Sequence, residues 1–183
     1  MHSTFSESVR ARPFMYVPEN NAHIELLRAV LDNAAHEVTQ GFGTKISVRL
    51  LDTQTVSVTD DGRGIPVDIV PQRGHRSMLQ VVFEDEPGNS GFAPRAPHAS
   101  VVCALSNEVL VETTRAGRRY SARFVRGRLD VANYELGATE AKGTTVTLRP
   151  DSTLLGDFAF NRKDVVTCLE QFRRQSPTLQ IDF

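Results

Sequence analysis

The stretch TVSVTDDGRGIP, residues 55–66, joins a strand pattern to a tight glycine turn. Its first residues alternate polar and apolar side chains, which is typical of a half-buried β-strand. The two glycines that follow permit a turn with positive φ and a close approach of the backbone to a ligand. The sequence therefore predicts that Asp60 ends a strand on the floor of a pocket, where its carboxylate accepts a hydrogen bond from an exocyclic amine such as that of adenine.

A helix is predicted before this strand. Over residues 20–41 apolar side chains recur at intervals of three and four, with Asn20 or Asn21 as the N-cap and Gly41 as the stop. An isolated Asp-Gly pair is usually an ordinary turn, but such a turn after a helix that contains LDNAAHE is much less common. Positions 29, 33 and 37 lie on one stripe of that helix, because steps of four residues keep side chains aligned.

The remaining patterns predict an α+β two-layer sandwich, in which helices cover one face of a mostly antiparallel sheet. At 183 residues the chain is expected to form a single domain, residues 1–183. We expect residues 85–97, which are rich in Gly and Pro, to be irregular. The predicted strands are 45–51, 55–61, 108–114, 118–125, 128–135, 144–150 and 179–183, and the other predicted helices are 76–84, 98–106 and 162–175.

Composition argues against several classes of partner. The chain has 21 basic and 22 acidic residues, so no overall field favours nucleic acid or an anionic membrane. Six arginines in residues 115–128 are interpreted as one solvated face of a strand pair rather than as a nucleic-acid surface. No apolar run is long enough to cross a bilayer, and we expect a cytoplasmic protein. Cys103 and Cys168 are predicted to be reduced core thiols.

Taken together, these motifs give a chain that resembles the ATP-binding domain of DNA gyrase B and its topoisomerase IV counterpart, in the GHKL ATPase superfamily. The resemblance covers nearly the whole chain and implies a Bergerat-type fold. It is carried by the segments VRARPFMYV, LDNAAHE, VSVTDDGRGIP, ASVVCALS and KGTTVTLRP.

The resemblance implies roles for individual residues. Asn33 matches the magnesium ligand, which matters only if a magnesium nucleotide is bound, and Asp60 matches the residue that reads adenine. Thr144 matches the threonine beside the adenine-bound water. The rim used by nucleotides and aminocoumarin inhibitors in relatives would comprise Glu37, Arg63, Gly64, Ile65, Pro66 and Arg115.

The chain departs from the family at its phosphate end. Where the family has the glutamate that activates the attacking water, this sequence has Ala29, whose methyl group cannot accept a proton. Where relatives have a glycine-rich phosphate loop, residues 93–98 read APRAPH, and the two prolines remove backbone donors. Because the sequence ends at Phe183, we also expect no transducer domain. The chain alone is therefore predicted to be neither a competent ATPase nor a topoisomerase.

Three functional hypotheses follow. The first is a stand-alone, degenerate domain whose former nucleotide cleft binds a small organic ligand, as a cyclase or isomerase of specialised metabolism with Asp60, Glu37 or His36 as acid or base. The second is a non-catalytic binder of gyrase inhibitors or of a partner subunit. The third is an ATP-binding protein with weak or no hydrolysis. Binding of Mg-ATP and formation of a homodimer stay open, and we expect no membrane and no direct nucleic-acid contact.

Overall fold

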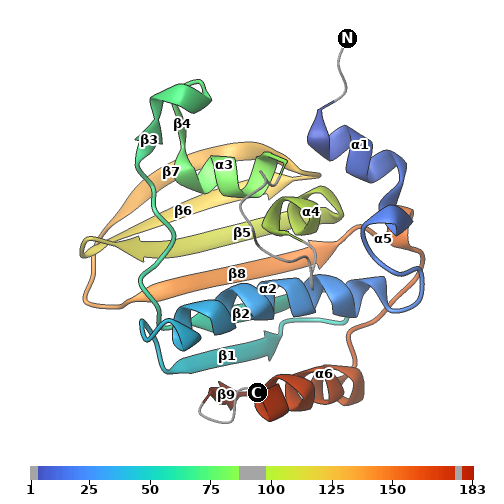
Figure 1. The fold of residues 1–183 in the computed structure, drawn as a ribbon. Coiled ribbons are helices and arrows are strands. Elements are labelled where there is room, and N and C mark those ends of the chain that lie inside the picture. The colour runs from blue at the N-terminus through green and yellow to red at the C-terminus, as the bar shows by residue number, and fades with distance from the viewer. Residues whose placement is uncertain (1–3, 87–97, 176–178) are drawn as a thin grey trace.

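The computed structural model describes residues 4–86, 98–175 and 179–183, apart from the side chains of residues 132–134 (Figure 1). The predicted irregular segment 85–97 and the proline-containing phosphate loop therefore fall largely outside the described residues. Within the described ranges, none of the helices combines the length and the apolar character that a membrane span requires.

A seven-stranded sheet forms the base of the domain, in the order β7-β6-β5-β8-β2-β1-β9. Neighbouring strands are antiparallel except for β1 and β9, which are parallel, so the predicted mixed and mostly antiparallel sheet is confirmed. A separate two-stranded sheet joins β3 (Ile69–Val70) to β4 (Arg76–Ser77). The main strands are β1 (Lys45–Leu50), β2 (Val56–Asp60), β5 (Ser106–Arg115), β6 (Arg118–Val125), β7 (Arg128–Ala138), β8 (Gly143–Pro150) and β9 (Gln180–Asp182).

Helices lie over one face of this sheet, as predicted. In Figure 1, α2, α3 and α4 lie in front of the central strands, while α6 lies beside the edge formed by β1 and β9. The α-helices are α1 (Phe5–Ala11), α2 (Ala22–Thr39), α3 (Met78–Glu84), α4 (Ala99–Ala104), α5 (Ser152–Leu155) and α6 (Arg162–Gln175), and the 3₁₀ helices are η1 (Pro13–Met15) and η2 (Pro71–Arg73).

The core lies between α2 and the sheet. One face of α2 buries Leu27 and Leu31, and the alternating strands β1 and β2 bury Ile46 and Val56 beneath it. This packing is what the two sequence periods predict. Because α2 is fixed along its length, the residues on its other face have defined positions relative to the end of β2.

Both cysteines are buried and free, as predicted for core thiols. Burial raises the pKa of Cys103 and raises the pKa of Cys168 to about 11, so both remain thiols at neutral pH.

The two ends of α2 differ in how well the sequence predicts them. Asn21 is the N-cap residue, as predicted, but it has φ 63° and its side chain makes no capping hydrogen bond. Gly41 is a correct stop: it has φ 80°, and the amide of Phe42 donates to the carbonyl of Glu37 at 3.0 Å. This is a Schellman motif, which turns Phe42 back towards the helix.

Helices α3 and α1 are among the elements that differ from the prediction. The helix expected over residues 76–84 begins only at Met78, because Arg76–Ser77 pair with β3 and the Ser77 hydroxyl accepts from the amide of Gln80. Helix α1 was not predicted, although Thr4 and Glu7 form a capping box at its start. Its Arg10 contacts the buried carboxylate of Asp151 at 2.7 Å and so ties α1 to the end of β8.

An aromatic cluster encloses His23 in the first turn of α2. Its ring stacks on Phe158 at 4.9 Å between centroids and meets the edge of Phe160 at 5.2 Å. Its Nε2 has no hydrogen-bond partner among the described residues. Burial lowers the pKa of His23, while the charge of Asp164 opposes that shift, so the neutral imidazole is the form that packs here.

Candidate functional site

Asp60 is the last residue of β2, and its carboxylate is buried, with the residue 8% exposed. Its Oδ1 accepts the amide hydrogen of Gly62 at 2.8 Å, and its backbone lies in register with Thr144 of β8. Burial raises the pKa of Asp60 to about 6, against the opposing effect of backbone hydrogen bonds from Gly62 and Thr144. Asp60 is therefore mainly a carboxylate at neutral pH, and a charge of that kind in this position costs free energy.

The neighbouring Asp61 has a structural environment. Its carboxylate accepts from the amide and hydroxyl of Thr44, at 2.7 and 2.8 Å, and from the amide of Lys45 at 2.9 Å. Burial raises the pKa of Asp61, but these hydrogen bonds more than offset it and the net pKa is lowered. Asp61 thus fixes the start of β1.

The loop after Asp60 lies tightly against β5. Gly64 has φ +78°, and a Cβ at this position would lie 1.9 Å from the carbonyl oxygen of Thr114. On the other side of the site, Gly143 has φ +99°, and its Cβ would lie 1.8 Å from the carbonyl oxygen of Asp60. Only glycine fits at either position, because neighbouring backbone lies directly against each of them.

Two side chains of β5 hold this loop. The hydroxyl of Thr113 accepts the amide hydrogen of Ile65 at 2.7 Å. The guanidinium of Arg115 donates to the carbonyl oxygens of Arg63 and Gly64, at 3.3 and 3.5 Å. The structure therefore brings the predicted rim residues 63–65 and Arg115 together.

Thr113 was missed by sequence reasoning. Its hydroxyl lies 3.4 Å from that of Thr144, which was predicted, so Thr113 joins the loop to the floor of the site. The available signal was its position two residues before Arg115 in an alternating strand, which places both on one face. Pro66, the last predicted rim residue, is half-buried where the chain leaves the loop.

Glu37 and Arg63 form a two-armed ion pair across the rim. The guanidinium donates to the two carboxylate oxygens at 3.1 and 2.9 Å, and the amide of Arg63 adds a bond at 3.2 Å. The guanidinium carbon also lies 3.5 Å from the ring centroid of Phe42, which the Schellman turn brings here. Hydrogen bonds from Arg63 lower the pKa of Glu37, so Glu37 holds its charge and is a poor proton donor.

The three residues of the predicted stripe on α2 lie in three different environments. Ala29 is 7% exposed and belongs to the core cluster, Asn33 is exposed, and Glu37 is half-buried at the rim. Asn33 is thus the polar group of this stripe that stands nearest to Ala29. The side chain of Ala29 has no atom that accepts a proton.

The other ionisable groups of this part of α2 lie elsewhere. Asp32 is half-buried and faces α6, where its charge acts on Cys168. His36 is exposed, and its charge contributes to lowering the pKa of Glu37. Among the described residues no group of three or more His, Cys, Asp or Glu side chains could hold a metal ion.

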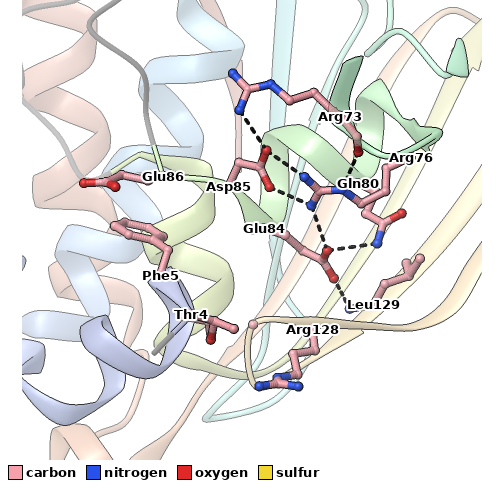
Figure 2. Close-up of a pocket in the computed structure, with 12 residues that line it drawn as sticks. Thr4, Phe5, Arg73, Arg76, Gln80, Glu84, Asp85, Glu86, Arg128 and Leu129 are labelled. Carbon is pink, nitrogen blue, oxygen red and sulfur yellow. Dashed lines mark hydrogen bonds and ion pairs between the residues drawn. The ribbon is translucent and has the colours of Figure 1, made fainter. Parts of the chain in front are cut away.

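A cavity of about 670 Å³ lies away from these residues, between α1, α3, η2 and the turn from β6 to β7 (Figure 2). Arg76 pairs with Asp85 at 2.6 Å and with Glu84 at 3.5 Å. Glu84 also accepts from Gln80 at 2.9 Å and from the amide of Leu129. These polar groups satisfy one another, and the network joins α3 to β7. None of the predicted site residues lines this cavity.

The arginine-rich strands 115–128 do not form an uncompensated basic surface. Five of the six arginines pair with acidic side chains, while Arg115 holds the loop that follows Asp60. The pairs are Arg118–Glu135, Arg119–Glu112, Arg123–Glu108, Arg123–Asp130, Arg126–Asp151 and Arg128–Glu7.

Comparisons with known proteins show similarity over most of the chain. Residues 20–154 match the family described as "Histidine kinase-, DNA gyrase B-, and HSP90-like ATPase". The chain is 34% identical over 168 residues to the DNA gyrase B protein of Thermus thermophilus, covering 85% of the chain and 26% of that protein. It is 33% identical to the DNA gyrase B protein of Thermotoga maritima over an alignment of 188 positions, which covers 97% of the chain and 29% of that protein. The chain thus spans well under half the length of these relatives.

Two solved structures have the same fold. The 43K ATPase domain of Thermus thermophilus gyrase B, in complex with an aminocoumarin, matches with TM-score 0.80 and 32% identity over 88% of this chain and 43% of that one. The topoisomerase IV ATP-binding domain of Francisella tularensis, in complex with a small-molecule inhibitor, matches with TM-score 0.83 and 29% identity over 98% of this chain and 88% of that one. The predicted fold class is confirmed.

Proposed function

The chain belongs to the histidine kinase-, DNA gyrase B- and HSP90-like ATPase family, and from this premise we propose that it binds an adenine nucleotide over Asp60 and hydrolyses ATP slowly or not at all. The observation that carries the proposal is the buried carboxylate of Asp60 at the end of β2. This is the third of the three hypotheses drawn from the sequence.

A buried charge without a cation partner is costly and calls for an explanation. None of the ion pairs between described residues includes Asp60, and burial keeps its pKa near 6. Groups of this kind concentrate at binding and catalytic sites. A carboxylate accepts hydrogen bonds only, so it complements the exocyclic amino group of adenine.

The rim is preorganised for a flat ligand. Arg63 is held by Glu37 on one side and lies over the ring of Phe42, while Arg115 holds the backbone of the loop. An arginine fixed in this way offers the second face of its planar guanidinium without losing much conformational entropy.

Magnesium would reach the site with the nucleotide. Asn33 is exposed and offers one amide oxygen, which suits an ion that takes few protein ligands and keeps several waters. When bound, the ion would neutralise charge on the phosphates.

The proposal of slow hydrolysis rests on Ala29. A positioned general base typically accelerates a reaction by about 10²–10⁴-fold. Ala29 has no proton acceptor, Asp32 faces α6, and Glu37 is engaged with Arg63. Binding without efficient turnover is the function these contacts support.

The same contacts weigh against the cyclase or isomerase hypothesis. Of its three suggested acid–base residues, Glu37 is paired and its pKa is lowered, and His36 is exposed. Only Asp60 combines burial with a pKa close to neutrality.

A second candidate function is binding of an aminocoumarin. The Thermus thermophilus relative was solved with such a compound, and Arg115 holds the loop that would form the rim here. Calorimetric titration of the chain with novobiocin should release heat. A titration without heat would remove this candidate and leave the nucleotide proposal intact.

The test of nucleotide binding is a calorimetric titration with magnesium and a non-hydrolysable ATP analogue. Wild-type protein should bind and Asp60→Asn should not. The matched control is Asp52→Asn, which removes the same charge in the exposed turn between β1 and β2 and should bind normally. No binding by folded wild-type protein, or equal binding by Asp60→Asn, would contradict the proposal.

A further inference from the structure

Thr113 is a polar residue on the buried face of β5, where its neighbours Val109 and Val111 are apolar, and it is 1% exposed. Its Oγ1 accepts the amide hydrogen of Ile65 at 2.7 Å, lies 3.4 Å from Oγ1 of Thr144 and lies 3.5 Å from the carbonyl oxygen of Ile65. Burying a hydroxyl here costs free energy that valine, which has nearly the same shape, would avoid. The burial of this hydroxyl therefore has to be explained by its contacts.

The hydroxyl has one proton and two lone pairs. The amide of Ile65 uses a lone pair at short distance, which leaves the proton of Thr113 for Thr144 or for the carbonyl of Ile65. When Thr144 accepts this proton, its own proton is free to point towards a ligand. Thr144 lies in register with Asp60, so its donor would stand beside the Asp60 acceptor.

The bond to Ile65 also controls the position of the loop. The chain from β2 to β3 passes the ends of β8 and β5 (Figure 1), and Gly64 already lies against the backbone of β5. The same loop begins at Gly62, whose amide donates to Asp60. A shift at Ile65 would therefore be transmitted along a few residues to the Asp60 carboxylate and to Arg63.

We infer that Thr113 is a positioning residue of the proposed nucleotide site, which fixes the 62–66 loop on β5 and directs the hydroxyl of Thr144 towards the ligand. The inference rests on the proposed function for the identity of the ligand. Its first part, the fixing of the loop, is a property of the protein alone.

The experiment compares Thr113→Val, which keeps the shape and removes the hydroxyl, with Thr113→Ser, which restores it. The control is Thr145→Val. Thr145 pairs with Thr59 at 3.0 Å, and as the next residue of β8 its side chain lies on the opposite face of the sheet from that of Thr144. Two quantities are measured: amide hydrogen exchange at Ile65 by NMR, and the affinity for the magnesium ATP analogue by calorimetry.

In Thr113→Val we expect exchange at Ile65 to be about tenfold faster and binding about tenfold weaker, as the loss of one buried hydrogen bond implies. Serine should restore both, and Thr145→Val should change neither. Unchanged exchange would overturn the inference, and so would faster exchange with unchanged affinity, because Thr113 would then be only structural. If folded wild-type protein binds no nucleotide, the proposed function fails, and the exchange rate alone decides whether Thr113 fixes the loop.

Discussion

Replacing Asp60 by asparagine should make the protein more stable while it removes the binding function. In the folded protein burial raises the pKa of Asp60 from the ordinary aspartate value of 3.8 to about 6. Each unit of pKa difference is worth 1.36 kcal/mol, so the ionised carboxylate costs about 3 kcal/mol at neutral pH. Asparagine carries no charge and keeps an oxygen that can accept from the amide of Gly62. We expect a net gain of about 1–3 kcal/mol, since the new amide group needs a partner.

The pH dependence of the stability difference between Asp60→Asn and wild type tests the sign of this effect independently. Because the folded pKa lies above the unfolded one, the contribution of Asp60 to stability is fully present below about 3.8 and is lost as the pH rises through about 6. Asparagine does not titrate, so the advantage of Asp60→Asn should be largest above pH 6 and should vanish near pH 4. Carboxylates with lowered pKa that do not act on Asp60, such as Asp52 and Asp151, destabilise both proteins equally in acid and cancel in the difference.

Urea unfolding followed by circular dichroism from pH 4 to 8 measures this difference directly. An Asp60→Asn protein that is less stable than wild type at pH 7.5 would refute the reasoning. So would a stability difference that stays constant across the pH range, because the cost would then not come from ionisation.

Three further predictions concern α1 and α2. Ala29→Glu should raise the rate of ATP hydrolysis by about 10²-fold. Ala35→Glu, at a similarly buried position of α2, should leave that rate unchanged. Equal rates in the two variants would contradict the assignment of position 29 to the general base. Because burial lowers the pKa of His23, stability should fall as the pH drops below 6.5, and His23→Phe should flatten that fall in urea titrations; an unchanged pH profile would show that His23 does not titrate in its aromatic cluster. Arg10→Ala should lower the free energy of unfolding by about 3 kcal/mol, because it leaves the buried carboxylate of Asp151 with Arg126 as its cation, at 3.9 Å instead of 2.7 Å; a loss below 1 kcal/mol would mean that α1 is anchored by other contacts.

The sequence predicts the sheet and α2 well because their hydrophobic periods persist over many residues. The two strands before the GRGIP turn, β1 and β2, and the stop at Gly41 follow from local rules that tertiary contacts do not override. The N-terminal helix was missed because it is short and is stabilised by a contact between Arg10 and Asp151, which no local pattern predicts. Arg76 and Ser77 were assigned to a helix because their pairing with β3 is likewise not visible in the sequence.

The residues of the candidate site likewise fall into those that local motifs predict and those that only the three-dimensional structure reveals. Asp60 and Asn33 were recognised from their motifs, and the structure places Asp60 where the strand pattern indicated. The pairing of Glu37 with Arg63 depends on how the end of α2 meets the loop, which requires three-dimensional geometry. Thr113 lies in the site only through the register of β5, and a strand pattern gives the face of a residue but not its neighbours.

Selectivity between purines tests the central claim most directly. The carboxylate of Asp60 accepts the amino hydrogens of adenine but meets an oxygen in guanine, which is also an acceptor. Calorimetric titration of the wild-type protein with magnesium and the non-hydrolysable analogues of ATP and GTP should show at least about tenfold tighter binding of the adenine compound. Equal affinity for the two, or binding of neither by folded protein, would contradict the account of Asp60 as the residue that selects the ligand.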